Sequence, residues 1–211
     1  MKTTLRCFTP MMFLAFVMGM VAGCGDDSSS DGTAGAGGSG GSGGAGGSED
    51  AGGGDANETK ITSSTGDWTV YPNPYGADGG ANPISATIMG SAEAFANGTT
   101  MRVKLTVSGL PANRPFGSHI HKLPCEDSSK AGGHYQHNPA PDGGAADPMY
   151  ANSKNEVWLD FVTTASGTGS AEATVDFIPR AGEAKAVMLH DMMTMTGGLA
   201  GAKLACINMP F

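Results

Sequence analysis

The sequence predicts an all-β domain, a Greek-key β-barrel or sandwich of about eight strands, over residues 61–211. In several short segments polar and apolar residues alternate, as they do in half-buried strands. Turn-forming residues, mostly Gly, Asn, Ser and Pro, separate these segments. No segment shows the 3.6-residue apolar periodicity of an amphipathic helix, so an all-β class is favoured over a mixed one.

The clearest strand is 100–107, in which polar and apolar residues alternate without a break. The pair Asn97-Gly98 directly before it favours a tight turn, which predicts a hairpin with a strand in 85–95. The Gly- and Pro-rich stretch 139–155 is expected to be a long loop.

Two further segments, 156–163 and 169–178, predict a second hairpin across the turn 165–168. The segments 185–190 and 203–209 supply the remaining expected strands.

Residues 1–23 predict a bacterial signal peptide. Lys2 and Arg6 precede an apolar stretch, 11–23, that falls short of the roughly 20 residues a membrane-spanning helix needs. The motif Val21-Ala22-Gly23-Cys24 resembles a lipobox, with Val where Leu is usual, and such a motif makes the Cys the lipidated first residue. An ordinary secretory signal with Cys24 incidental is the alternative. The lipobox predicts a lipoprotein anchored through Cys24 to a membrane of the cell envelope, facing the periplasm or the outer surface.

Residues 24–60 combine this Cys with a tether rich in Gly, Ser and Asp. The tether has too few apolar residues to build a core and is expected to be disordered. It also explains the net charge of −8, since seven of the 20 acidic residues lie between 26 and 58, where there is no basic residue. The domain that follows has no basic stripe, so no nucleic-acid partner is expected.

All five histidines lie in three short segments of the domain, at His119 and His121, at His134 and His137, and at His190. Neutral imidazole is the most common ligand for copper and zinc in proteins. In a strand, residues i and i+2 point to the same face, so His119 and His121 would project together. The clustering favours a metal site, while two half-exposed surface histidines are the alternative for this pair.

Two cysteines, Cys125 and Cys206, remain once the signal peptide is removed and Cys24 is lipidated. In an oxidising compartment they are expected to pair. The disulfide would close a loop of about 80 residues and would fix the segment that carries His134.

Several motifs follow one another through the domain: Gly117-Ser118-His119-Ile120-His121, then Cys125, then Ala131-Gly132-Gly133-His134, then Val187-Met188-Leu189-His190-Asp191, then Gly201-Ala202-Lys203-Leu204-Ala205-Cys206. In order and approximate spacing they resemble the Cu/Zn superoxide dismutase family, which has H-V-H, a Cys soon after, G-P-H or G-G-H, V-V-H-E and G-x-R-L-A-C. The resemblance covers all of 61–211. It implies a Greek-key β-barrel that uses copper to convert superoxide to dioxygen and hydrogen peroxide.

The resemblance also implies a role for each matching residue. His119, His121 and His190 would bind copper, and His134 would be the fourth ligand, which in the family bridges copper to zinc. Cys125 and Cys206 would form the structural disulfide.

Lys203 stands where the family has an arginine that attracts superoxide and binds it at the copper. Lysine keeps the positive charge but lacks the planar two-pronged donor of arginine. A solvated lysine at a strand end, with no such role, is the alternative.

The sequence departs from the family at the zinc site, because only His137 is left over once copper has its ligands. We therefore expect a copper-only relative, with an incomplete zinc site. In place of zinc, Glu156 or Asp160 is expected to accept a hydrogen bond from Nδ1 of His134, although Asp160 also fits a solvent-facing strand position. His137 is expected to be a loop residue rather than an outer copper ligand or a residual zinc ligand.

Two other functions remain open. Met188, Met192, Met193 and Met195 lie around His190 in the sequence, and thioether sulfur favours Cu(I). A copper-binding or carrier lipoprotein without turnover is therefore the main alternative to the enzyme. A relative that binds no metal is the third, and the presence of all four copper-type histidines disfavours it.

Overall fold

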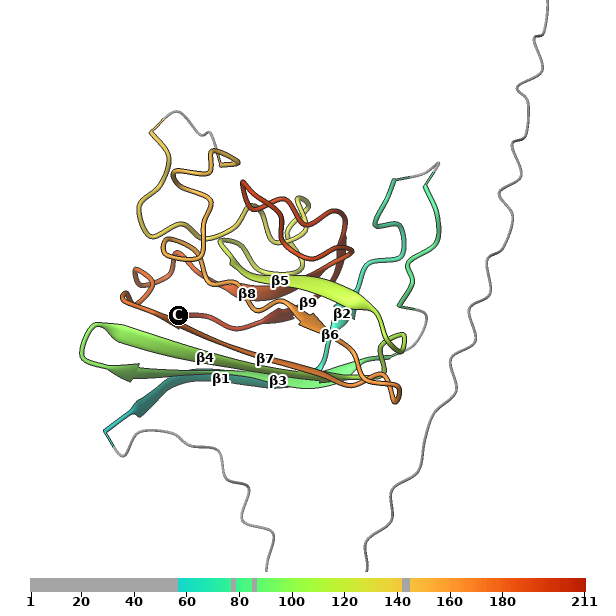
Figure 1. Ribbon diagram of the computed structural model, residues 1–211, viewed down its shortest axis with the longest axis horizontal. Helices are drawn as coiled ribbons and strands as arrows, with labels where there is room; N and C mark the ends of the chain where they lie inside the picture. Colours follow the sequence, from blue (N-terminus) through green and yellow to red (C-terminus); the bar gives the residue numbers. More distant parts are fainter. Residues whose placement is uncertain (1–56, 77–78, 85–86, 142–144) are drawn as a thin grey trace, which may run out of the picture. The chain divides into compact units, whose positions relative to one another are not determined.

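The computed structural model describes residues 57–76, 79–84, 87–141 and 145–211. Over these residues the chain is all-β, with nine strands in two antiparallel sheets and no helix (Figure 1). The two sheets are not closed into a barrel, so they fit the sandwich form of the prediction. The expected signal peptide, Cys24 and the tether as far as residue 56 lie outside the described residues. None of the described residues forms a helix of the length and apolar character that crossing a bilayer requires.

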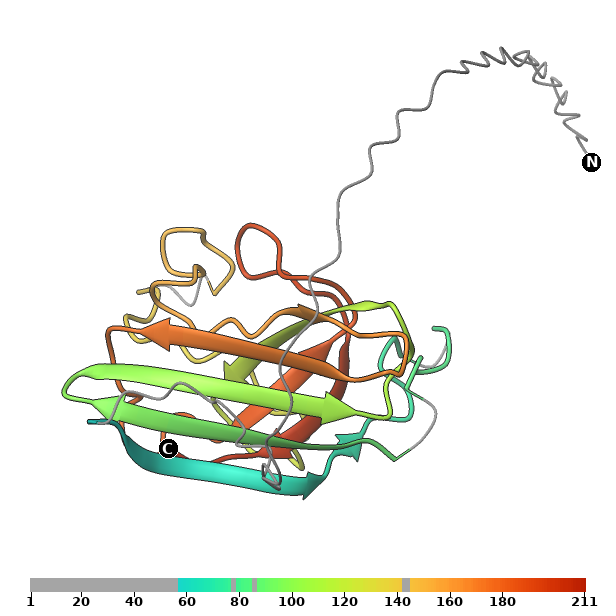
Figure 2. The same cartoon turned by 60° about the horizontal axis from the view of Figure 1, so that its bottom comes forward.

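The first sheet has four strands in the order β1-β3-β4-β7 (Figure 2). These strands are β1 (Thr59–Asp67), β3 (Met89–Asn97), β4 (Thr100–Ser108) and β7 (Gly169–Val175). The turn at Asn97-Gly98 is present as predicted: Asn97 pairs with Thr100, and Gly98 adopts the positive φ of 61° that such a tight turn requires. The sequence did not predict β1, which is largely polar and begins two residues before the expected boundary at 61.

The second sheet has five strands in the order β2-β9-β8-β5-β6. These strands are β2 (Thr69–Val70), β9 (Lys203–Asn208), β8 (Ala186–His190), β5 (Pro115–His121) and β6 (Phe161–Val162). The short strands β2 and β6 lie at the two edges, and β8 and β5 lie in the middle. The expected strands 185–190 and 203–209 correspond to β8 and β9.

The predicted hairpin of 156–163 with 169–178 is wrong. The turn between them exists, with Thr164 N donating to Thr168 O at 2.7 Å, but its two arms enter different sheets. β6 pairs with β5, and β7 pairs with β4. Packing decides this: the Phe161 ring lies 5.6 Å from that of Phe116 between the sheets, and Gly169 has no Cβ that would collide with it.

A large apolar core fills the space between the sheets, with Leu105 of β4 facing it from one side and Ile120 of β5 from the other. Because side chains alternate along β5, burial of Ile120 in this core turns His119 and His121 to the opposite face. The loops that follow β5 and β8 lie over that face, on the side away from the first sheet (Figure 1). The site described next is therefore built between the second sheet and these loops.

Candidate metal centre

Two neighbouring strands and one loop bring four histidines together. His119 and His121 come from β5, and His190 ends the adjacent strand β8. His134 joins them because the loop that carries it returns alongside β5, where an isolated bridge pairs it with His121. Tyr135 N then donates to Ile120 O at 2.8 Å and continues this local pairing.

The four imidazoles form a single compact group. One ring nitrogen from each of His119, His121, His134 and His190 lies within 4.8 Å of the others. Nε2 of His121 and Nε2 of His190 are 3.1 Å apart, and the rings of His119 and His134 stack with centroids 3.9 Å apart. His119, His121 and His190 are buried, whereas His134 is partly exposed. Among the described residues, this is the one group of His, Cys, Asp or Glu side chains able to hold a metal ion.

Burial keeps three of the four rings, those of His119, His121 and His190, uncharged. Loss of hydration places the pKa of His119 and of His121 well below the usual range, and the neighbouring His134 lowers both further. Burial, again with His134 as a second cause, lowers the pKa of His190 to about 3. At neutral pH these three side chains are neutral imidazoles, the form that coordinates metal ions.

Each ring is oriented by a hydrogen bond from the nitrogen that does not face the cluster. Nδ1 of His121 donates to Gly132 O at 3.0 Å, and Nδ1 of His190 lies 3.4 Å from Gly201 O. His119 is held by its other nitrogen, with Nε2 2.7 Å from Oγ1 of Thr194. Its Nδ1 is buried and has no hydrogen-bond partner, which is costly unless another ligand satisfies it. A metal ion among the four rings would use that lone pair.

Glu156 holds the fourth histidine. Nδ1 of His134 donates to Oε2 of Glu156 at 2.9 Å, and the glutamate is only 1% exposed. The same carboxylate accepts from Trp158 Nε1 and from Gln136 Nε2, each at 2.8 Å. Of the two acids expected to bind His134, the structure therefore brings Glu156 to it.

Asp160 contacts a different part of the site. Its Oδ1 accepts from Ser118 N at 3.1 Å and from the Thr194 hydroxyl at 2.6 Å, while its Oδ2 accepts from Thr194 N at 2.6 Å. Asp160 thus reaches His119 through Thr194 and makes no hydrogen bond to His134. The sequence did not predict Thr194, which lies 75 residues from His119, or Trp158, which acts on the site through its bond to Glu156.

Lys203 lies at the entrance to the cluster. It lines a hollow of about 220 Å³ together with His121, His134 and Leu199. Its Nζ donates to Ser129 O at 2.9 Å and to Gly132 O at 2.5 Å. Partial burial lowers the pKa of Lys203, and the nearby positive charge of Lys130 lowers it further.

His137 lies outside the four-histidine group. Its ring stacks on Phe177, with centroids 4.5 Å apart and an interplanar angle of 13°. The guanidinium of Arg180 donates to its main-chain carbonyl. The structure thus places His137 against an aromatic ring and outside the group of clustered histidines that includes His134.

The disulfide between Cys125 and Cys206 is present. It joins the loop after β5 to strand β9, and Tyr71 Oη donates to Cys125 O at 2.9 Å beside it. The start of the loop that delivers His134 is therefore attached covalently to the second sheet.

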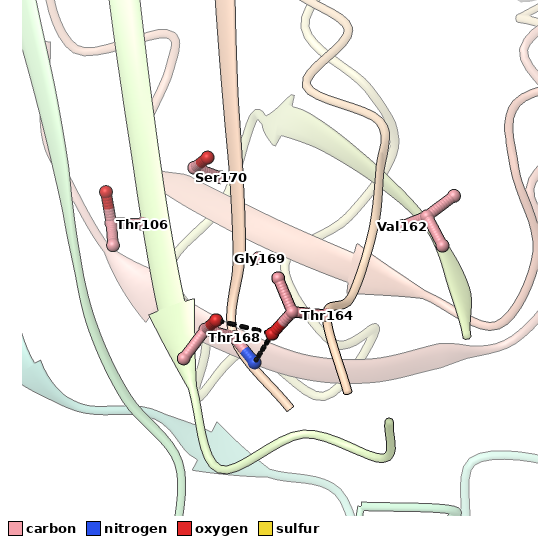
Figure 3. A pocket seen from close by; sticks show the side chains of 6 residues that line it. All are labelled: Thr106, Val162, Thr164, Thr168, Gly169 and Ser170. Carbon is pink, nitrogen blue, oxygen red and sulfur yellow. Dashed lines mark hydrogen bonds between the residues drawn. The ribbon is translucent and has the colours of Figure 1, made fainter. Parts of the chain in front are cut away.

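A second hollow lies at the turn between β6 and β7 (Figure 3). It is lined by Thr106, Val162, Thr164, Thr168, Gly169 and Ser170. The hydroxyls of Thr164 and Thr168 are 2.7 Å apart and satisfy each other. None of these six residues is titratable near neutral pH, so we assign no acid–base chemistry to this hollow.

The sequence matches no protein-family model, and a comparison with curated proteins yields no match. All-β architecture, a disulfide and a cluster of four histidines able to bind a metal ion are together compatible with a Cu/Zn superoxide dismutase-like fold.

Proposed function

We propose that this protein is a copper-dependent superoxide dismutase with a superoxide dismutase-like fold. The observation that carries the proposal is the group of four imidazoles in which Nδ1 of His119 is buried without a partner. An unsatisfied buried nitrogen on one of four clustered imidazoles is the arrangement expected of a metal site.

The set of donor atoms favours copper over the hard cations. All four ligands, His119, His121, His134 and His190, are imidazoles, and no carboxylate belongs to the group. Calcium and magnesium prefer oxygen ligands, whereas imidazole suits copper in both of its common oxidation states. Copper held there would supply a one-electron couple, by which two superoxide ions and two protons give one dioxygen and one hydrogen peroxide.

Glu156 supports the proposal of a copper-only centre. In the family that the sequence resembles, zinc holds the bridging histidine, and here a buried carboxylate accepts the Nδ1–H of His134 instead. Fixing this proton leaves Nε2 of His134 as the ligand atom. Glu156 would thus orient the ring of His134 without a second metal, as zinc orients the bridging histidine in the family.

Lys203 supports an anionic substrate. Its ammonium lies at the hollow that reaches His121 and His134, where it attracts a small anion toward the cluster. The two carbonyls that it binds, those of Ser129 and Gly132, hold this charge at the entrance. The remaining part of the proposal is that Cys24 carries a lipid anchor that places the domain in a bacterial cell envelope.

Metal analysis and an activity assay together test the proposal. The purified protein, loaded with copper, should contain copper rather than zinc and should remove superoxide rapidly in a pulse-radiolysis or cytochrome-competition assay. The His121→Gln variant should lose both copper and activity, whereas His137→Gln should keep both. Zinc in place of copper, or copper without superoxide removal, would overturn the proposal.

A copper carrier without turnover is the second candidate. Three methionines beside the site, Met192, Met193 and Met195, are exposed, and thioethers prefer Cu(I). Tight Cu(I) binding with no superoxide removal in the same experiments would favour the carrier.

A further inference from the structure

The methionines of the described domain divide sharply into buried and exposed. Met101, Met188 and Met209 are fully buried in the core. Five others are exposed: Met89 at 54%, Met149 at 75%, Met192 at 42%, Met193 at 39% and Met195 at 50%. Three of these five lie within four consecutive residues after β8, a local concentration of exposed thioether that core packing does not explain.

The segment that carries Met192, Met193 and Met195 is held in place by main-chain hydrogen bonds. Met192 N donates to Ala200 O at 3.0 Å, and Met195 N donates to Leu199 O at 2.8 Å. Thr194, between Met193 and Met195, is fixed by its two bonds to Asp160. The three methionines are therefore presented to solvent by an ordered loop.

This loop is also part of the four-histidine site. The hydroxyl of Thr194 bonds to Nε2 of His119. Gly197, Gly198 and Leu199, from the far arm of the loop, line the hollow that reaches His121 and His134. The exposed thioethers thus lie on the same segment as Thr194, which orients His119. The same segment also supplies residues that line the hollow leading to His121 and His134.

Thioether chemistry indicates which ion such a group takes. Thioether sulfur is a soft ligand that selects Cu(I) over the harder divalent ions. The Cα atoms of Met193 and Met195 lie within about 7.6 Å of each other, because consecutive Cα atoms are 3.8 Å apart. Each methionine has three rotatable side-chain bonds, so three neighbouring exposed sulfurs can converge on one ion.

We propose that Met192, Met193 and Met195 form a Cu(I)-binding site that captures copper at the surface and delivers it to the four imidazoles. The delivery step rests on the proposed function, since it requires copper at the histidines. The binding step does not, and it can be measured separately.

Anaerobic titration with Cu(I), in competition with a chromophoric Cu(I) chelator, tests the binding step. The variant replaces Met192, Met193 and Met195 by Leu, which conserves side-chain volume but removes sulfur. It should bind about one Cu(I) ion fewer per chain than the unaltered protein, since the soft ligands are gone. Met89→Leu, which removes an equally exposed methionine from the first sheet, is the matched control and should bind as many ions as the unaltered protein.

The delivery step is tested by the rate at which the histidine site fills. With Cu(I) supplied by the chelator, filling should be slower in the triple variant than in Met89→Leu, whereas filling with Cu(II) should be equally fast in both. Equal Cu(I) stoichiometry in the triple variant and the control would overturn the binding site, and equal Cu(I) filling rates would overturn delivery. Failure of the histidines to bind copper, which would also overturn the proposed function, has a different signature: no protein then shows a nitrogen-coordinated Cu(II) signal by electron paramagnetic resonance.

Discussion

The hydroxyl of Thr194 lies 2.7 Å from Nε2 of His119 and 2.6 Å from Oδ1 of Asp160. A threonine hydroxyl has a single proton to donate, and the carboxylate of Asp160 can only accept. Thr194 therefore donates to Asp160 and accepts from His119, which places the ring proton on Nε2. The lone pair on Nδ1 of His119, which is buried and has no partner, is left to bind a metal ion.

Removing this hydroxyl should weaken metal binding. In Thr194→Val the ring of His119 loses the partner that fixes its tautomer, so we expect copper affinity to fall roughly 10–100-fold. Thr194→Ser keeps the hydroxyl and should bind nearly as tightly as the unaltered protein. Competition titration against a copper chelator measures both, and equal affinity in the Val and Ser variants would contradict this role.

Neutralising Glu156 should also weaken copper binding, because Glu156 orients the ring of His134. Glu156→Gln removes the negative charge of the carboxylate whose Oε2 accepts the Nδ1–H of His134, and it also disturbs the bonds to Trp158 and Gln136. Copper affinity should therefore fall roughly 10–100-fold. Glu93→Gln, at a partly exposed position on β3, is the control and should leave copper affinity and turnover unchanged. If the two variants bind copper equally well and keep the same turnover, the carboxylate does not orient the ligand.

Activity should depend on salt through Lys203. Added salt screens the attraction between this ammonium and superoxide, because the Debye length falls from about 10 Å at 0.1 M to about 3 Å at 1 M. Turnover should therefore decrease with ionic strength in the unaltered protein and in Lys203→Arg. At low salt, turnover should be slower in Lys203→Glu than in the unaltered protein, and added salt should not decrease the turnover of this variant further. Identical salt profiles for all three proteins would exclude a steering role.

The disulfide should contribute a large share of the stability. Cys125 and Cys206 are 81 residues apart, and closing a loop of this length stabilises a fold by about 4–5 kcal/mol in the chain-entropy model. The double variant Cys125→Ala/Cys206→Ala should lose an amount of this order in urea unfolding. Reductant should destabilise the unaltered protein and leave the variant unchanged. A variant as stable as the oxidised protein would show that the crosslink adds nothing.

The metal-free protein should lose stability as the pH falls from 7 to 5. The folded-state pKa values of His119, His121 and His190 lie below the ordinary value of 6.5, so at these three positions only the unfolded chain takes up protons in this range. Each such histidine makes unfolding easier by about 1.4 kcal/mol per pH unit below 6.5. Melting temperatures of the metal-free protein should fall accordingly, and less steeply in His190→Gln. A melting temperature that stays constant or rises would contradict burial of neutral rings.

Alternation along a strand was a reliable guide to β5. A histidine on each side of the apolar Ile120 predicted that both imidazoles share one face, and the structure has Ile120 in the core with His119 and His121 opposite. The same kind of pattern could not assign partners to β6 and β7. Alternation shows which face of a strand is buried, but it does not show to which sheet the strand belongs. Contacts between side chains, such as that of Phe161 with Phe116, determine the sheet.

The residues around the ligands were harder to predict than the ligands. Histidine is rare enough for its clustering to indicate a metal site, and the resemblance to the Cu/Zn superoxide dismutase family singled out the four histidines that the structure brings together. Thr194 and Trp158 belong to common polar and aromatic types, and each reaches the site only after a loop has folded back. Glu156 and Asp160 were both candidates, but only the three-dimensional path of the chain separates their roles.

The buried carboxylate of Glu156 also fixes the formal charge at the cluster. The three buried rings are neutral, so this anion is the charged group in direct hydrogen-bond contact with the ligands among the described residues. A monovalent ion held by the imidazoles would be balanced by it, giving an electroneutral site, and a divalent ion would leave a single positive charge. Because uncompensated charge in a protein interior is costly, this balance would favour the monovalent state of a copper ion bound there.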